Sequence, residues 1–437
     1  MVNMQLLKRN LIILTLMLTG LCSKAQFLMD MVDTTSETGK GLLSIYKKYD
    51  HLRFGGYIQP EFQVASSKGI KTFEGPNFGE RVSNRFLLRR SRIRIDYAHF
   101  NEEHAAGVQF VFQFDANERG FTVRDVWGRI FENKYKLFAF TTGMFARPFG
   151  YETNLSSSDR ESPERGRMNQ TLMKSERDLG AMISFDARKE IHPFKNLKID
   201  VGLFNGQGIA STGEFDNNKD LITRVSLKPT KLKNKVLLSA GASMLYGGLE
   251  NNTKYYFTTV DGIGGKQVQV DSSLTNLGKV EPRRYYGADI QLKVKTKAGY
   301  TELRGEVITG KQTANANSSE TPVDLLTGTS GFYTRNFRGA YFYFLRNIFS
   351  PKHQLILKYD FYDPNTKVSK KEIGTAAGFT TADIKYNTFG VGYLNYITPN
   401  VKLVLYYAKV NNESTSLSGY TKDAKDDVFT CRLQFRF

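Results

Sequence analysis

The sequence predicts an all-β protein, specifically a sixteen-stranded antiparallel transmembrane β-barrel. From residue 51 to the C-terminus, polar and apolar residues alternate with a period of two, as in strands with one polar and one apolar face. The chain contains 32 Phe and 23 Tyr, which suits the aromatic girdles of a barrel better than an aliphatic sandwich core. After residue 25 there is no apolar run of about 18 residues, which argues against a transmembrane helix.

The first 25 residues are predicted to be a cleaved signal peptide. A basic start precedes an apolar run over residues 11–21, and Ser23-Lys24-Ala25 has the small-residue pattern of a cleavage site. Residues 26–50 are expected to form an N-terminal segment on the periplasmic side, and residues 51–437 the barrel. Export would leave Cys431 as the single cysteine, so no internal disulfide is expected.

The alternation defines sixteen predicted strands. They lie near residues 53–65, 85–99, 104–116, 121–132, 135–145, 177–188, 196–204, 220–229, 235–247, 284–297, 299–311, 335–347, 353–363, 384–395, 400–410 and 427–437. An even number places both chain ends on one side of the membrane. Connections on that side are short, whereas most on the other side are long, namely 66–84, 146–176, 248–283, 312–334, 364–383 and 411–426. We therefore expect short periplasmic turns and long outer loops, with a soluble β-sandwich as the alternative fold.

The most strongly charged stretch, residues 89–97, supplies the first candidate site. Arg90, Arg92 and Arg94 share one strand face, and an arginine facing lipid at mid-membrane costs about 2–4 kcal/mol, so we expect all three to face the lumen. At a spacing of about 6.6 Å, their guanidiniums could guide phosphate-like anions through bidentate hydrogen bonds. An equally open interpretation is that they pair with lumen carboxylates and stiffen the wall.

Further basic candidates come from later strands and from one long loop. Strand parity places Arg224, Lys293, Lys295 and Arg304 on the lumen face. The loop 146–176 is longer than an ordinary hairpin connection, so we expect it to fold inward as the third loop and to constrict the pore. Its basic candidates are Arg147, Arg160, Arg165, Arg167 and Lys174. Inward acids are nearly as numerous as inward bases, so anion preference would depend on local clustering.

The sequence offers little support for catalysis, a metal or a cofactor. The five histidines are isolated, mostly at strand ends or turns, and have no metal-ligand spacing. Residues 216–220 begin like a calcium loop, but Leu221 and Leu227 stand where Gly and a bidentate Glu are needed. No Ser–His pairing suggests a barrel hydrolase, and an exported basic chain is not expected to bind nucleic acid. We therefore expect a non-enzymatic protein without cofactor or metal.

Several motifs resemble the phosphate-selective porin O and P family. They are Arg89-Arg90-Ser91-Arg92, the stretch 143–152 (GMFARPFGYE), the third-loop block over 157–180, Asn205-Gly206-Gln207-Gly208 and the hairpin 392–400. The terminal Phe437 resembles the aromatic signal read by the barrel assembly machinery. The resemblance implies a usually trimeric outer-membrane porin for phosphate or related anions, with Arg90 and Arg92 lining the path and Arg165 in a narrowing third loop. This third loop is richer in acids and Arg than the family pattern, which bears on selectivity rather than on the fold.

We therefore expect an outer-membrane passive diffusion channel of a Gram-negative bacterium for small anions such as phosphate or polyphosphate. It would be a homotrimer surrounded by outer-membrane lipid and lipopolysaccharide. One alternative is a general or sugar-permeable porin without anion selectivity, for which the inward tyrosines would be Tyr57, Tyr285, Tyr362 and Tyr406. The other is a barrel that anchors an adhesion or secretion complex through the loops 248–283 and 312–334.

Overall fold

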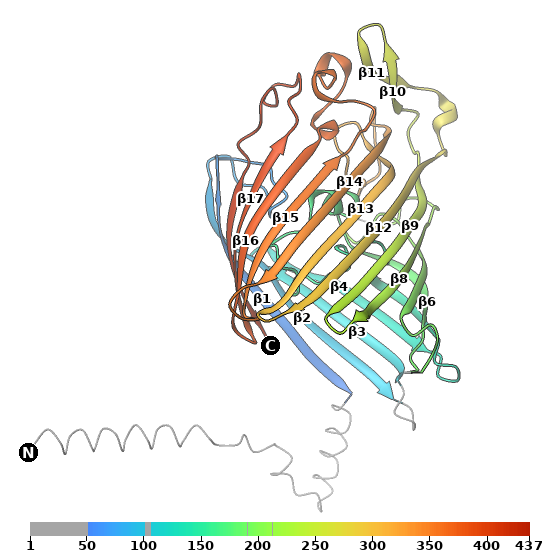
Figure 1. The fold of residues 1–437 in the computed structure, drawn as a ribbon. Helices are drawn as coiled ribbons and strands as arrows, with labels where there is room; N and C mark the ends of the chain where they lie inside the picture. Colours follow the sequence, from blue (N-terminus) through green and yellow to red (C-terminus); the bar gives the residue numbers. More distant parts are fainter. Residues whose placement is uncertain (1–50, 101–105, 190, 212) are drawn as a thin grey trace, which may run out of the picture. The chain divides into compact units, whose positions relative to one another are not determined.

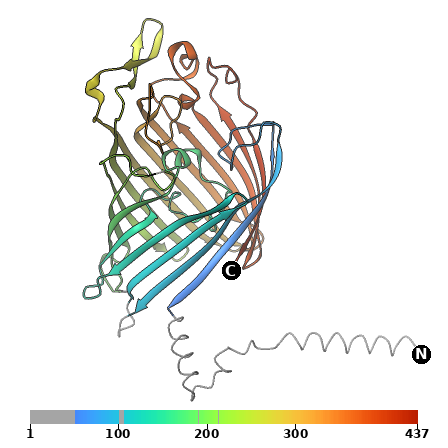
Figure 2. The same ribbon diagram turned by 180° about the vertical axis from the view of Figure 1, so that it is seen from behind.

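The computed structural model describes residues 51–437 except 101–105, 190 and 212. The predicted signal peptide and the segment 26–50 lie outside the described residues. In the described part, sixteen antiparallel strands form one closed wall, whose two sides are seen in Figures 1 and 2. The wall strands are β1 (Leu52–Ala65), β2 (Asn84–Phe100), β3 (Ala106–Asn117), β4 (Gly120–Phe131), β5 (Phe138–Ala146), β6 (Arg177–Asp186), β7 (Leu197–Phe204), β8 (Asp220–Lys233), β9 (Val236–Glu250), β12 (Val280–Thr296), β13 (Gly299–Asn315), β14 (Phe332–Asn347), β15 (His353–Asp363), β16 (Tyr386–Thr398), β17 (Val401–Asn412) and β18 (Val428–Arg436).

Each wall strand pairs with its neighbour around the ring, and β9 pairs directly with β12. The ring closes where β1 pairs with β18, with Ile58 opposite Phe435 and Glu61 opposite Arg432. All sixteen predicted strands are therefore confirmed, with ends that differ by only a few residues. The alternation was a reliable guide because every wall strand separates two different environments along its whole length.

The wall has apolar residues outside and polar residues inside. On β1, Gln59, Glu61 and Gln63 are buried, whereas Ile58 and Val64 are 38% and 40% exposed. A soluble sandwich buries the apolar face of its strands, so the alternative sandwich fold is wrong. The exposed apolar face is the surface that a transmembrane barrel presents to lipid.

The long connection between β9 and β12 holds a hairpin that the alternation did not predict. It consists of β10 (Tyr256–Gly262) and β11 (Gly265–Asp271), followed by the short helix η3 (Leu274–Asn276). Figure 1 shows the hairpin projecting beyond the end of the wall opposite the C-terminus. Its contact with the wall sheet is a short parallel pairing of Tyr256 and Phe257 with the start of β14.

The other helices lie in loops. Three single-turn helices, η4 (Lys370–Glu372), η5 (Thr375–Ala377) and η6 (Thr381–Asp383), follow β15, and α3 (Arg167–Leu172) lies between β5 and β6. Within the described ranges, no helix combines the length and the apolar content needed to cross a bilayer.

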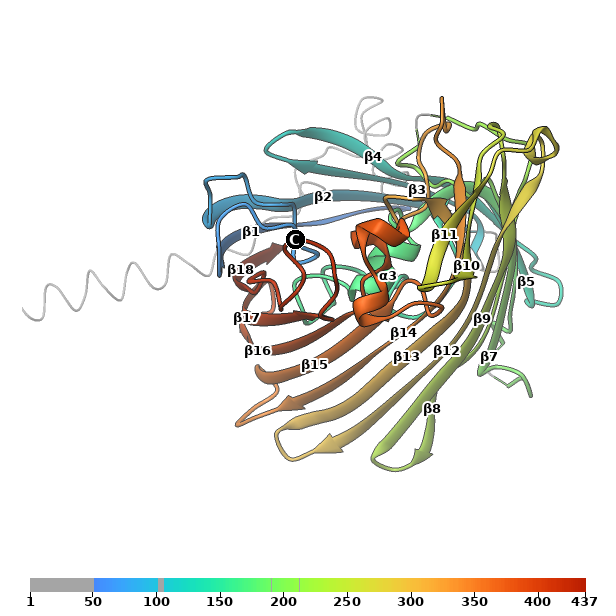
Figure 3. The ribbon, with the colours of Figure 1, turned by 90° about the horizontal axis from the view of Figure 1, so that it is seen from above.

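The third loop, residues 147–176, extends into the ring of strands, where Figure 3 shows α3 in the view from above. Its side chains Phe149, Met168 and Leu172 are at most 1% exposed. They belong to a buried cluster with lumen-facing side chains of the wall such as Tyr285 and Phe337. The interior beside β12–β17 is therefore partly filled by packed apolar groups, while charged groups gather elsewhere.

Candidate functional site

The third loop is held to β1, β2 and β18 by a central carboxylate, that of Glu164. Arg89 and Arg90 each donate two hydrogen bonds to it, with shortest N–O distances of 2.8 Å. Arg432 of β18 donates a further bond at 3.1 Å and also pairs with Glu61 of β1. The loop thus reaches wall strands that are far from it in the sequence.

A second carboxylate, that of Glu152, holds the loop against the opposite part of the wall. The Tyr343 hydroxyl of β14 donates to it at 2.9 Å, and the Lys358 ammonium of β15 lies 3.3 Å away. Within the loop, the Gly166 amide and the Asn169 side chain both donate to Glu152 at 2.8 Å. Because Glu152 and Glu164 contact different strands, the loop is anchored on two sides of the interior.

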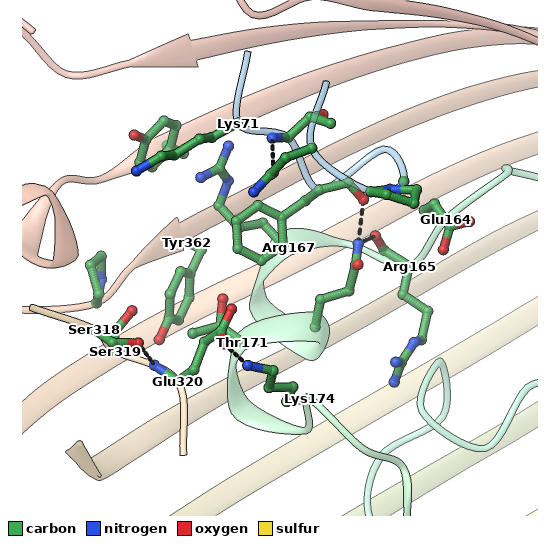
Figure 4. A pocket seen from close by; sticks show the side chains of 18 of the residues that line it. Lys71, Glu164, Arg165, Arg167, Thr171, Lys174, Ser318, Ser319, Glu320 and Tyr362 are labelled. Carbon is green, nitrogen blue, oxygen red and sulfur yellow. Dashed lines mark hydrogen bonds and ion pairs between the residues drawn. The ribbon is translucent and has the colours of Figure 1, made fainter. Parts of the chain in front are cut away.

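Beside the third loop lies a chamber of about 590 Å³, shown from close by in Figure 4. The third loop lines it together with the loop 66–83, wall residues of β2–β4, β15 and β16, and the loops that follow β13, β15 and β17. Its lining contains eight basic and five acidic side chains: Lys71, Arg89, Arg90, Arg92, Arg124, Arg165, Arg167 and Lys174, with Asp115, Glu164, Glu176, Glu320 and Asp426. The lining therefore has an excess of positive charge, which favours anions over cations near it.

The three predicted arginines of β2 all have carboxylate partners. Arg90 bonds to Glu164, and Arg92 donates to Asp115 at 2.9 Å and to the Ser157 hydroxyl at 3.0 Å. Arg94 forms a bidentate pair with Asp96 on its own strand, at 2.7 and 2.8 Å. Two of these three, Arg90 and Arg92, line the chamber, whereas Arg94 is not among its lining residues.

The predicted loop residues separate into two groups. Arg147 and Arg160 are buried, 2% and 3% exposed, and lie outside the chamber lining. Arg147 donates to backbone carbonyls of Ser175 and Gly206, and Arg160 donates to that of Pro163. These two arginines therefore hold the loop in shape.

The remaining predicted loop residues, Arg165, Arg167 and Lys174, line the chamber. Arg165 lies 3.4 Å from Glu176, and Lys174 lies 2.7 Å from Glu320.

The four predicted residues of later strands lie outside the chamber lining. Arg224 pairs with Asp289 at 2.6 Å, Lys293 with Glu302 at 3.2 Å, and Arg304 with both Glu161 and Glu302. Lys295 is exposed near the end of β12. The structure therefore does not bring these four residues to the chamber.

Arg167 differs from the other chamber arginines. Its guanidinium carbon lies 3.5 Å from the centre of the Tyr386 ring and 4.4 Å from that of Phe73. Among the described residues, no carboxylate lies within 4.0 Å of the charged nitrogens of Arg167, and the same holds for Lys71. Stacking on aromatic rings thus holds the Arg167 cation in place without a direct ion pair.

Several arginines that line the chamber or bind the loop were not among the predicted site residues, among them Arg89, Arg124 and Arg432. Arg89 neighbours Arg90 yet bonds to the same carboxylate, which a strict two-residue alternation would not predict. Arg124 of β4 binds Glu176 with both contacts at 2.8 Å, and Arg432 binds Glu164. The strand pattern could place Arg432 inward, but only the path of the third loop shows what it contacts.

Two loop carboxyl groups near the chamber have raised pKa values. Burial raises the pKa of Asp426 to about 6, against the lowering effect of Arg167. Burial likewise raises the pKa of Glu74, beside the chamber residues Phe73 and Gly75, to about 7. The net charge around the chamber therefore becomes more positive as the pH falls through this range.

No group of three or more His, Cys, Asp or Glu side chains in the part of the chain that the structure describes is arranged to hold a metal ion. What the site offers is instead an array of guanidinium and ammonium donors around a chamber inside a barrel, which is chemistry for binding or passing anions.

A closed sixteen-stranded barrel with a polar interior and a loop inside it defines the class of porin-like channels. The chain belongs to the phosphate-selective porin O and P family, whose model matches residues 69–437. This confirms the resemblance seen in the sequence, and it identifies the protein as a channel-forming porin rather than an enzyme. A search of curated proteins finds no significant match to this chain.

Solved structures similar to this chain are outer-membrane proteins of low sequence identity. OprB of Pseudomonas putida, solved at high pH, gives a TM-score of 0.57 at 10% identity and covers 92% of this chain and 97% of its own. The outer membrane channel DcaP of Acinetobacter baumannii gives 0.52 at 11% identity, covering 88% and 97%. The outer membrane protein OmpT of Vibrio cholerae, in its trimer form, gives 0.50 at 8% identity, covering 88% and 99%. At these identities the similarity establishes the barrel fold.

Proposed function

We propose that this porin is a passive outer-membrane diffusion channel for small anions such as phosphate or polyphosphate. The observation that carries the proposal is the chamber, whose lining has eight basic and five acidic side chains and includes Arg167 and Lys71 without a carboxylate partner among the described residues. A cation that is not neutralised attracts a passing anion more strongly than one already paired. The family name, which refers to phosphate selectivity, supports the same choice.

In this proposal the third loop is the constriction. Its anchors at Glu152 and Glu164 hold it across the interior, and its packed apolar side leaves the charged chamber as the hydrated route. The twelve residues predicted from the sequence then have unequal roles. Arg90, Arg92, Arg165, Arg167 and Lys174 would act on the permeating anion, and the others would shape the wall and the loop.

The general or sugar-permeable porin remains the second candidate, because most chamber arginines are ion-paired. The inward tyrosines give little support to a sugar path. Tyr285 and Tyr406 are at most 2% exposed within the apolar cluster, and Tyr57 is 7% exposed and bonds to Ser157 of the third loop. Tyr362 alone of these four lines the chamber.

The test is single-channel recording in a KCl gradient, followed by titration with phosphate. An anion channel gives a reversal potential on the chloride side and a chloride current that phosphate blocks. A reversal potential near zero with no effect of phosphate would assign a general porin. Absence of both conductance and liposome swelling would instead favour the barrel anchor for an adhesion or secretion complex.

Assembly and location follow the same proposal. We expect a homotrimer in outer-membrane lipid and lipopolysaccharide after removal of residues 1–25, and the trimer form of the similar OmpT structure supports this state. The oligomer is tested by crosslinking and native mass measurement in detergent, and the cleavage site by sequencing the N-terminus of the exported protein.

A further inference from the structure

The environment of Glu164 is that of a bound anion. Its two oxygens accept five hydrogen bonds from Arg89, Arg90 and Arg432, with N–O distances of 2.8–3.1 Å. A fourth guanidinium, that of Arg160, lies 4.0 Å away. The Glu164 side chain is 3% exposed. Several bidentate or near-bidentate guanidinium contacts on one planar group are the arrangement that proteins use for carboxylate and phosphate ligands.

The arginines around Glu164 outnumber the acids that they contact. Arg432 is shared with Glu61, so four guanidiniums face two carboxylates. A surplus of positive charge therefore remains even when Glu164 is in place. Such a cluster would bind a second anion, or exchange its own, more readily than a balanced pair.

This cluster borders the chamber, and its most accessible member is Arg89, whose side chain is 23% exposed. Arg89, Arg90 and Glu164 all belong to the chamber lining, and Figure 4 shows Glu164 and Arg165 at one side of it. An oxyanion that reaches this side meets the same guanidinium donors that Glu164 occupies. A solute oxyanion at this side would therefore compete with the loop carboxylate for one set of hydrogen bonds.

We propose that Glu164 is a tethered counter-anion that occupies an oxyanion-binding site of the chamber and thereby sets the selectivity of the channel. The inference deepens the proposed function and rests on it. Small oxyanions, with phosphate as the probe, bind there by sharing or displacing the contacts of Glu164. Glu164 keeps the affinity low enough for release, as conduction requires.

The loop does not depend on Glu164 alone for its position. Glu152 contacts Tyr343 and Lys358, and Lys402 donates to the carbonyls of Ser158 and Arg160 at 2.6 and 3.2 Å. Replacing Glu164 by Gln keeps the shape of the side chain and one acceptor oxygen. The substitution therefore removes the charge while the other anchors remain.

The experiment compares Glu164→Gln with Glu161→Gln. Both remove one charge from the same loop, but Glu161 pairs with Arg304 outside the chamber lining. We expect phosphate to block the chloride current of Glu164→Gln at a concentration about fivefold lower than in the wild type, the effect of one unit charge at about 4 Å in water. Glu161→Gln should change this concentration by less than about twofold, since Arg304 keeps Glu302 as a partner.

Equal changes in the two variants, or no change in Glu164→Gln, would overturn the proposal. Folding is checked by heat-modifiable mobility on gels. If Glu164→Gln does not fold, Glu164→Asp is tested instead, because the shorter carboxylate must lose part of the five hydrogen bonds. A rise in phosphate affinity in this variant supports the proposal. An unchanged phosphate affinity refutes it. The wild-type reversal potential tests the proposed anion preference separately from the role of Glu164. A wild-type potential near zero would refute the anion preference alone, whereas equal phosphate block in the two variants would refute the role of Glu164 alone.

Discussion

Replacing Arg167 by Gln is expected to weaken anion preference more than the loss of any ion-paired lumen arginine. Arg167 is held against the Tyr386 and Phe73 rings at 3.5 and 4.4 Å and has no carboxylate within ion-pair distance in the described part of the chain. A unit charge about 4 Å from a solute anion is worth about 1 kcal/mol in water. This corresponds to about a fivefold change in anion permeability, and because the same charge repels cations, the anion-to-cation permeability ratio should change by at least that factor.

The assay is the reversal potential in a KCl gradient, measured for the wild type, Arg167→Gln, Arg167→Lys and Arg94→Gln. Arg167→Lys keeps the charge and should stay within about twofold of the wild type, which separates electrostatics from aromatic stacking. Arg94→Gln makes the same change of charge in an arginine that Asp96 neutralises at 2.7 Å, so its effect should be smaller. The reasoning is refuted if Arg94→Gln lowers the ratio as much as Arg167→Gln does.

Three further outcomes can be measured. Anion preference should rise as the pH falls from 8 to 5, because the pKa of Asp426, raised to about 6, lets this chamber carboxyl lose its charge in that range. Asp426→Asn should flatten this dependence on pH. A variant profile parallel to that of the wild type would contradict the reasoning. Asp383→Ala should lower the free energy of unfolding by about 3–5 kcal/mol in denaturant titrations, since it leaves the fully buried Arg335 without its carboxylate. Gly143→Ala should lower the free energy of unfolding by about 1–3 kcal/mol in the same assay. Gly143 has a φ of 121°, and an added Cβ would lie 2.8 Å from the Trp127 Cα. An unchanged free energy of unfolding would show that the strand relaxes freely.

The barrel wall could be predicted because each strand carries its own evidence. On β1, polar Gln59 and Gln63 face inward and apolar Ile58 and Val64 face outward, and this contrast is visible without knowing any partner strand. The hairpin β10–β11 escaped prediction because its alternation is short. It also lies outside the wall, where no lipid face requires apolar side chains.

The contacts of the charged residues could be predicted only in part. Strand parity placed Arg90 and Arg92 inward, but it contained no information about the third loop, which supplies the partners Glu164 and Ser157. Arg167 was predicted simply as one basic residue of a long loop. Its special position depends on Phe73 of the loop after β1 and on Tyr386, the first residue of β16, which meet it only in the folded chain.

The two interpretations of the β2 arginines that the sequence left open are both compatible with one arrangement. The guanidiniums of Arg90 and Arg92 are paired, as a structural role requires, yet Arg90's partner is a carboxylate carried by the third loop rather than by the wall. A solute anion can displace a loop carboxylate with less change to the backbone than a wall carboxylate, because the hydrogen bonds between neighbouring strands do not fix the position of the loop. Whether these arginines only stabilise the structure or also bind permeating anions therefore depends on how easily the hydrogen bonds of Glu164 are exchanged. The selectivity of this porin should respond more to the acidic residues of the third loop than to the number of lumen arginines.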